Sequence, residues 1–137
     1  MGTVYETLTL KNAADVANAE RGIIPEQDVR ETTVNAIVDA RMFTIIISEE
    51  VREKLELRIR GTREVTLAND KKEVCKVAEP VEIHWKNRDV TLPAIVSSGW
   101  GEILLGSLPL EHMDLMVDPV NKRLAGVHGD KIVSLLL

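Results

Sequence analysis

The stretch Ala36-Ile37-Val38-Asp39-Ala40-Arg41, together with Ile103-Leu104-Leu105-Gly106 further along, decides the fold of this chain. The first stretch is an apolar strand that ends in a single carboxylate, and the second is an apolar strand that ends in a glycine. Burial of a lone carboxylate is costly unless it is hydrogen-bonded, paired or protonated. From the residues alone, Asp39 either ends its strand and caps the next turn, or belongs to a functional site.

Apolar residues alternate with a period of two along most of the chain, which is typical of strands. Residues 12–28 are mostly polar or small, and Gly22 and Pro25 interrupt them, which predicts a loop or irregular excursion with a short helical turn at 13–19. Helical spacing is otherwise confined to a helix that Ser48 caps and that runs to residue 55 or 57, and to a turn or two at 109–113. Turn-forming residues at 68–72 and 86–89 predict two hairpins. The pattern predicts an all-β fold, a small closed β-barrel with one or two short helices. The strands are expected at 5–10, 29–38, 42–47, 65–67, 73–77, 81–85, 90–96, 103–105, 116–117 and 123–127.

The composition narrows the class of protein. A length of 137 residues fits one domain, 1–137. The net charge of −5, from 17 basic and 22 acidic side chains, argues against a nucleic-acid partner. No apolar run approaches the roughly 20 residues that span a bilayer, so no membrane is expected. Residues 1–6 lack a basic region followed by an apolar run, so no secretory signal is expected. Cys75 is the only cysteine, which fits a reducing compartment, and the expected location is the cytoplasm.

Several motifs in succession resemble the retropepsin-like (retroviral-type) aspartic proteases, in particular their bacterial single-domain members. Residues 34–47 resemble that family's strand, aspartate turn and returning strand, and residues 48–55 resemble the short helix that follows. Residues 65–70 resemble the family's flap hairpin, and 103–106 its apolar-apolar-glycine strand. The segment 115–124, Leu-Met-Val-Asp-Pro-Val-Asn-Lys-Arg-Leu, matches the family's closing segment. The resemblance covers residues 30–125 and implies a β-barrel of the acid-protease type.

The resemblance also implies a mechanism with Asp39 as the catalytic residue. Two carboxylates held about 3 Å apart share one proton, because both cannot ionise. One carboxylate then acts as general base on a water while the other protonates the substrate carbonyl. A chain with one such aspartate must form a homodimer to build the pair, and the expected partner is an extended peptide or protein segment.

The chain departs from the family at the centre of the motif, where Asp39-Ala40-Arg41 replaces Asp-Thr-Gly. In the family the threonine hydroxyl donates across the dimer, and the glycine lets the backbone approach water and carboxylates closely. Ala40 removes that hydroxyl and a hydrogen bond worth about 1 kcal/mol on each side. Arg41 either pairs with Asp39 and favours its charged form, or points outward across the dimer interface. The substitutions predict an impaired or inactive site.

The supporting residues keep two interpretations each. Gly106 is either a turn glycine or a close-packed residue beneath the aspartate loop, and Trp100 either lines the substrate cleft or packs against the barrel. The tip of the first hairpin is either a solvated turn or a substrate-covering flap. Its residues are Leu67, Ala68, Asn69 and Asp70.

No metal and no organic cofactor are expected, because the three histidines and Cys75 lack metal-ligand spacing. Two functions therefore remain. The chain is either an aspartic endopeptidase homologue that hydrolyses peptide bonds if its shared aspartates work, or a non-catalytic peptide- or protein-binding module on the same barrel.

Overall fold

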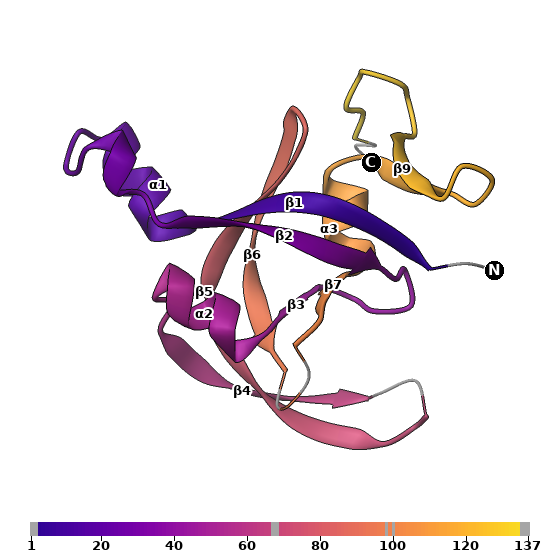
Figure 1. Cartoon of the computed structure of the whole chain (residues 1–137), viewed down its shortest axis with the longest axis horizontal. Coiled ribbons are helices and arrows are strands. Elements are labelled where there is room, and N and C mark those ends of the chain that lie inside the picture. Colours follow the sequence, from indigo (N-terminus) through magenta and orange to yellow (C-terminus); the bar gives the residue numbers. More distant parts are fainter. Residues whose placement is uncertain (1–2, 67–68, 98, 100, 135–137) are drawn as a thin grey trace.

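The barrel is built from strands that come from all parts of the chain (Figure 1). The computed structural model describes residues 3–66, 69–97, 99 and 101–134. Six strands pair in a ring, in the order β1, β2, β7, β3, β6, β5 and back to β1. The prediction of a small closed β-barrel is confirmed. The ring strands are β1 (Val4–Asn12), β2 (Glu31–Val38), β3 (Ile45–Ile47), β5 (Lys72–Trp85), β6 (Arg88–Val96) and β7 (Ile103–Leu105).

The other elements lie at the edges of this ring. Strand β4 (Ile59–Thr66) extends the sheet from β5, and β8 (Leu115–Asp118) and β9 (Arg123–Gly126) form a separate two-stranded sheet. The helices are α1 (Ala13–Glu20), α2 (Glu49–Leu55) and α3 (Ser107–His112), with a 3-10 turn η1 (Glu26–Asp28). In the described part of the chain, no helix combines the length and the apolar character that a bilayer crossing requires.

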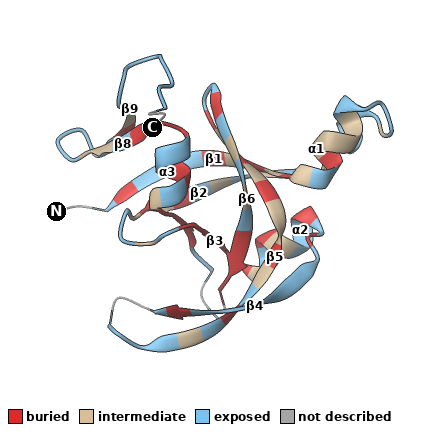
Figure 2. Ribbon diagram, turned by 180° about the vertical axis from the view of Figure 1, so that it is seen from behind, coloured by how far each residue is buried: buried red, intermediate tan, exposed pale blue. Residues whose placement is uncertain are grey.

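The buried residues line the inside of the ring (Figure 2). Strand β3 is buried on both faces, as its run of isoleucines predicts. Ile45 and Ile47 belong to the main core, whereas Ile46 packs in a second cluster with Leu104 of β7 and Val65 of β4. Burial of each side chain of this size stabilises the fold by about 1.5–3 kcal/mol. Because its side chains pack in both clusters, β3 joins the barrel to the β4–β5 hairpin.

Strand β5 is longer than the sequence predicts. Two strands, 73–77 and 81–85, were expected, but β5 runs unbroken through both with a register shift between Ala78 and Pro80. Pro80 stands opposite Pro93 on β6, and neither proline has an N–H for the ladder. The backbone N–H of Glu79 donates to Arg58 O at 2.9 Å, and the side-chain Oε1 of Glu79 accepts from Arg58 N at 2.7 Å. The prolines therefore cause a bulge and do not end the strand.

The second predicted hairpin turn is also tighter than expected. Lys86 and Asn87 alone connect β5 to β6, with Lys86 at φ 52°. Arg88, expected in the turn, is a strand residue only 3% exposed. Its guanidinium donates to Met113 O and Asp114 O, both at 2.8 Å, and to Gly129 O. It therefore bonds the Met113 carbonyl just beyond α3 and ties this end of the helix to the segment after β9.

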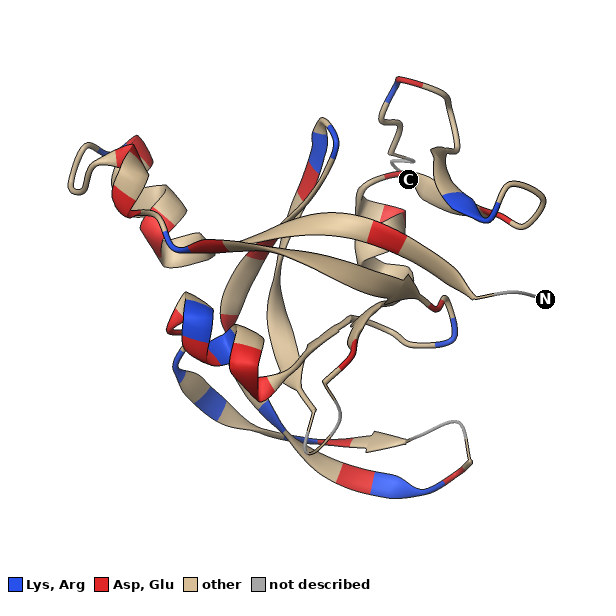
Figure 3. Cartoon of the chain, in the orientation of Figure 1, with Lys and Arg blue, Asp and Glu red and all other residues tan. Residues whose placement is uncertain are grey.

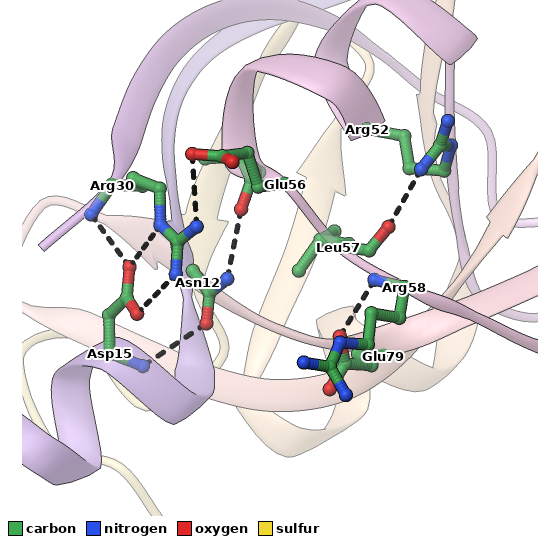
Figure 4. Close-up of polar contacts among 9 residues, drawn as sticks. Asn12, Asp15, Arg30, Arg52, Glu56, Leu57, Arg58 and Glu79 are labelled. Atoms are coloured by element: carbon green, nitrogen blue, oxygen red, sulfur yellow. Dashed lines mark hydrogen bonds and ion pairs between the residues drawn. The ribbon is translucent and has the colours of Figure 1, made fainter.

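The segment after β1 is held by a network of polar side chains beneath α1 (Figure 4). Asn12 caps α1 by accepting from Asp15 N at 3.1 Å, and it donates to Leu55 O at 2.9 Å. Arg30 forms a two-point contact with Asp15, at 2.7 Å for each side-chain bond, and reaches Glu56 at 3.0 Å. The predicted irregular excursion between the first two strands is thus an ordered helix and turn, anchored to α2.

Candidate functional site

Asp39 lies directly after β2, where two neighbouring strands meet. Val38 stands beside Leu105 in the parallel pair β2–β7, and Asp39 N donates to Leu105 O at 3.0 Å. The Asp39 side chain is 21% exposed. The turn after β2, the start of β1 and the β8–β9 sheet lie on the same side of the barrel (Figures 1 and 2). The carboxylate is therefore fixed at its base by the sheet and opens toward this side.

Arg41 occupies both oxygens of the Asp39 carboxylate. Nε of Arg41 donates to one oxygen at 3.0 Å and Nη2 to the other at 2.9 Å, and the Arg41 backbone N–H adds a bond of 3.0 Å to the first oxygen. Of the two predicted placements of Arg41, the single chain adopts the pair. The Arg41 side chain remains 79% exposed, and within the described residues its guanidinium is bonded to the Asp39 carboxylate alone.

The guanidinium also sets the ionisation of the carboxyl group. The hydrogen bonds from the Arg41 side chain lower the pKa of Asp39 below its ordinary value of 3.8, and partial burial opposes this only in part. The pair in turn raises the pKa of Arg41. At neutral and mildly acidic pH the carboxylate is therefore ionised and bonded to its own chain.

Gly106 packs directly against the Asp39 turn. A Cβ atom at this position would lie 2.5 Å from both Met42 O and Thr44 O. The backbone leaves no room because Gly106 N donates to Thr44 O at 2.9 Å and Ser107 N to Met42 O at 2.7 Å. Of the two predicted roles of Gly106, the geometry is that of the close-packed residue beneath the aspartate loop.

A pocket of about 540 Å³ opens beside Asp39. Thr3 and Val4 at the start of β1 form one wall, and Val117 and Pro119 around the end of β8 form another. The Asp118 carboxylate shapes that second wall by accepting from Val120 N at 3.0 Å and Asn121 N at 3.2 Å. Ala40 is exposed and, being an alanine, offers no hydroxyl to the opening.

The remaining predicted site residues fall into two groups. Asn69 and Asp70 are exposed in the turn between β4 and β5, where Asn69 Oδ1 accepts from Lys71 N at 3.1 Å and Asp70 has φ 62°. These are properties of a solvated turn. Leu67, Ala68 and Trp100 lie outside the described residues.

Asp15 and Arg88 are buried charged residues whose burial was not predicted. Asp15, of which 6% is exposed, lies in the predicted irregular excursion, and Arg88 lies in the predicted turn at 86–89. For Arg88 the signal was its place directly after Lys86-Asn87, since a two-residue turn returns the next residue to a strand.

No family model and no curated protein matches this chain. Among solved structures, it is similar to the retroviral protease-like domain of Ddi1 from Leishmania major, with a TM-score of 0.55 and 13% identity over 96% of this chain and 91% of that one. A retropepsin-like aspartic protease from Rickettsia conorii gives a TM-score of 0.43 and 12% identity over 86% of this chain and 89% of that one. The similarity to the Ddi1 domain shows a retropepsin-like fold for this chain.

Proposed function

We propose that this chain, a barrel of the retropepsin type, is a homodimeric protein that binds an extended peptide or protein segment without cleaving it. The observation that carries the proposal is the two-point contact of Arg41 with the Asp39 carboxylate. The proposed location is the cytoplasm, which the single, buried Cys75 supports.

The chemistry of an aspartate pair explains why Arg41 matters. Such a pair works only while one of its two carboxyls keeps a proton, because that proton goes to the substrate carbonyl. Arg41 lowers the pKa of Asp39, and in a symmetric dimer it would do so in both copies. Two ionised carboxylates, each bonded to a guanidinium, offer no acid and no free oxygen for a water. Hydrolysis then stops while the barrel stays intact.

The edge of β4 is the proposed docking surface for an extended segment. Among the strands of the described residues, β4 pairs with β5 alone, so its other edge offers backbone groups for strand addition. A groove of about 440 Å³ lies beside it, with apolar Phe43 and Leu108 and basic Arg60 and Arg63 in its lining. Basic residues lie along β4, although the chain as a whole carries a net negative charge (Figure 3). A segment with both apolar and acidic side chains fits this lining best.

Exposed apolar residues on the Asp39 side support a dimer there. Tyr5 of β1 is 52% exposed, and Met116 and Val120 around β8 are 47% and 85% exposed. Tyr5 pairs with Ile37, two residues before Asp39. A contact through this face would bring two copies of Asp39 toward one axis.

The test of silenced catalysis is cleavage of an unfolded protein substrate between about pH 3 and about pH 8. We expect no Asp39-dependent cleavage by the natural chain, and we expect the double variant Ala40→Thr with Arg41→Gly to gain it. Asp39→Asn, added to that double variant, is the matched control and should abolish the gain. Cleavage by the natural chain that Asp39→Asn removes would contradict the proposal.

The test of binding is fluorescence polarisation with a labelled peptide of alternating valine and glutamate. We expect saturable binding that Arg63→Glu weakens and that added salt weakens further. Arg21→Glu, at an exposed arginine outside the groove, is the matched control. An affinity for the peptide that is unchanged in Arg63→Glu would contradict a docking surface at β4.

Peptide-bond cleavage remains a second candidate function because the Arg41 side chain is 79% exposed. A partner subunit that drew Arg41 away would free the carboxylate. Cleavage that appears only at concentrations where the chain dimerises would favour this alternative.

A further inference from the structure

Three side chains with metal-binding atoms lie together on the outside of the barrel, near the end of the β5–β6 hairpin. Glu82 and His84 alternate along β5 and face outward, because Val81, Ile83 and Trp85 between and beside them are buried. Asp89 stands directly opposite His84 on β6. One ligand atom from each of the three lies within 4.8 Å of the other two.

Within this group, His84 contacts Glu82, and the Asp89 carboxylate has no bonded partner among the described residues. His84 Nε2 contacts Glu82 Oε1, and both side chains are largely covered, with 27% and 15% exposed. Among the described residues, the Asp89 side chain takes part in no hydrogen bond or ion pair. Two carboxylates and one imidazole thus lie close together with one contact among them, between His84 and Glu82. This arrangement leaves donor atoms available to a cation.

The surroundings of Glu82 attract cations. Glu82 lines a pocket of about 340 Å³ with Glu20, Glu26 and Glu31, and Lys11 is the basic residue of that lining. Acidic residues are frequent along α1 and at the start of β2 (Figure 3). Such a cluster of one sign raises the local concentration of cations and provides access from solvent.

We propose that Glu82, His84 and Asp89 bind one divalent ion of the first-row transition metals. One imidazole nitrogen and two carboxylate oxygens suit Zn²⁺ and its neighbours, whereas Mg²⁺ requires an octahedral shell of oxygens. Around Zn²⁺, ligand distances of about 2.0–2.2 Å keep any two donor atoms within roughly 4 Å. The donors must therefore close slightly from 4.8 Å, and the exposed Asp89 side chain can make that movement.

The bound ion would tie β5 to β6 two strand positions before the Lys86-Asn87 turn. Three protein ligands leave a fourth position for water. The site is independent of Asp39, because His84 pairs with Thr9 on β1 whereas Val38 pairs with Val4. Five residues of strand, about 17 Å, separate those two positions.

Titration calorimetry with Zn²⁺ on the full chain tests the site. We expect one ion per chain, a higher Tm with Zn²⁺, and no comparable binding of Mg²⁺. His84→Gln and Glu82→Gln should abolish stoichiometric binding. Asp89→Asn should weaken it by more than the roughly 10- to 100-fold that loss of an outer-sphere partner costs.

His112→Gln is the matched control, since His112 is an exposed histidine on α3 outside the group. It should bind Zn²⁺ like the natural chain. Asp89→Asn is the decisive variant, because the Asp89 side chain forms no hydrogen bond or ion pair with His84 and its change leaves the His84–Glu82 contact intact. Absence of saturable Zn²⁺ binding to the natural chain, or unchanged binding by Asp89→Asn, would overturn the proposal.

Discussion

Two aspartate–arginine pairs in this chain share one geometry and differ in everything around it. Asp15 and Arg30 are 15 residues apart and join α1 to the start of β2, with 8% and 39% of their side chains exposed. Asp39 and Arg41 are two residues apart in one turn, with 21% and 79% exposed. The first pair also reaches Glu56 after α2, whereas the Arg41 guanidinium contacts Asp39 alone among the described residues.

The difference shows how each region is held together. The α1 segment is held by charged side chains, because no apolar residue of that helix is buried. The Asp39 turn is held by backbone bonds and by the close approach of Gly106 to Met42 and Thr44. Removal of the charged pair should therefore unravel the first region and leave the second intact.

The largest expected effect is on the backbone packing of the Asp39 turn. Gly106→Ala places a methyl group 2.5 Å from two carbonyl oxygens, and we expect it to lower the free energy of unfolding by about 3 kcal/mol. Gly101→Ala is the matched control, because a Cβ there meets nothing within 4 Å. Chemical denaturation of both variants measures the difference. Equal stability would mean that the turn is not held by this packing.

The second effect is on the α1 segment. Arg30→Gln leaves the buried Asp15 carboxylate without its partner, and we expect a loss of about 2 kcal/mol, reduced from the cost for a fully buried pair because Arg30 is 39% exposed. Hydrogen exchange should show faster opening of residues 13–20. Glu56→Gln, which removes only the exposed contact of Arg30, should cost about 0.5 kcal/mol. A similar loss in both variants would contradict the assigned role of Asp15.

The third prediction concerns the loss of thermal stability at low pH, to which Asp15 contributes. The Arg30 side chain holds the pKa of Asp15 below its ordinary value of 3.8, so the ionised form stabilises the fold. That contribution is complete above the unfolded-state value and is lost as the pH falls from it toward the lowered value. Tm should therefore drop between about pH 5 and about pH 3, and less so in Asp15→Asn. A drop of the same size in the variant would assign the acid sensitivity to other carboxyl groups.

The smallest expected effect on stability comes from removal of the Asp39–Arg41 pair. Arg41→Gln should leave Tm unchanged within error, because the Arg41 side chain is exposed and the turn keeps its backbone bonds. Arg21→Gln, at another exposed arginine, is the matched control. A loss of stability in Arg41→Gln that approaches the loss in Arg30→Gln would break the distinction between the two regions.

The sequence predicts most of the barrel, because alternation and apolar runs report which strands have a buried face. It fails where that signal is absent. Of β4, only Val65 is buried, so its exposed residues carry no alternation, and the strand was predicted at 65–67 only. Strand β5 is continuous where two strands, 73–77 and 81–85, were expected, because its bulge at Pro80 depends on Pro93 of another strand.

The candidate site was predictable in position but not in geometry. Apolar strands that end in Asp39 and Gly106 indicate where the site lies, yet two placements of Arg41 are equally compatible with the residues. The grouping of Glu82, His84 and Asp89 was not predicted, because the spacing of the histidines and Cys75 alone gives no sign of it. The signal that could have found it is Glu-x-His on one strand with an aspartate across a two-residue turn.

The most direct test of the central claim is a ¹³C NMR titration of the Asp39 carboxyl in the natural chain and in Arg41→Gln. We predict a pKa below the ordinary 3.8 in the natural chain and a higher pKa in the variant, because the guanidinium is the main cause of the lowered value. A pKa at or above 3.8 in the natural chain, or the same pKa in both proteins, would contradict the claim that Arg41 keeps this aspartate ionised and silent.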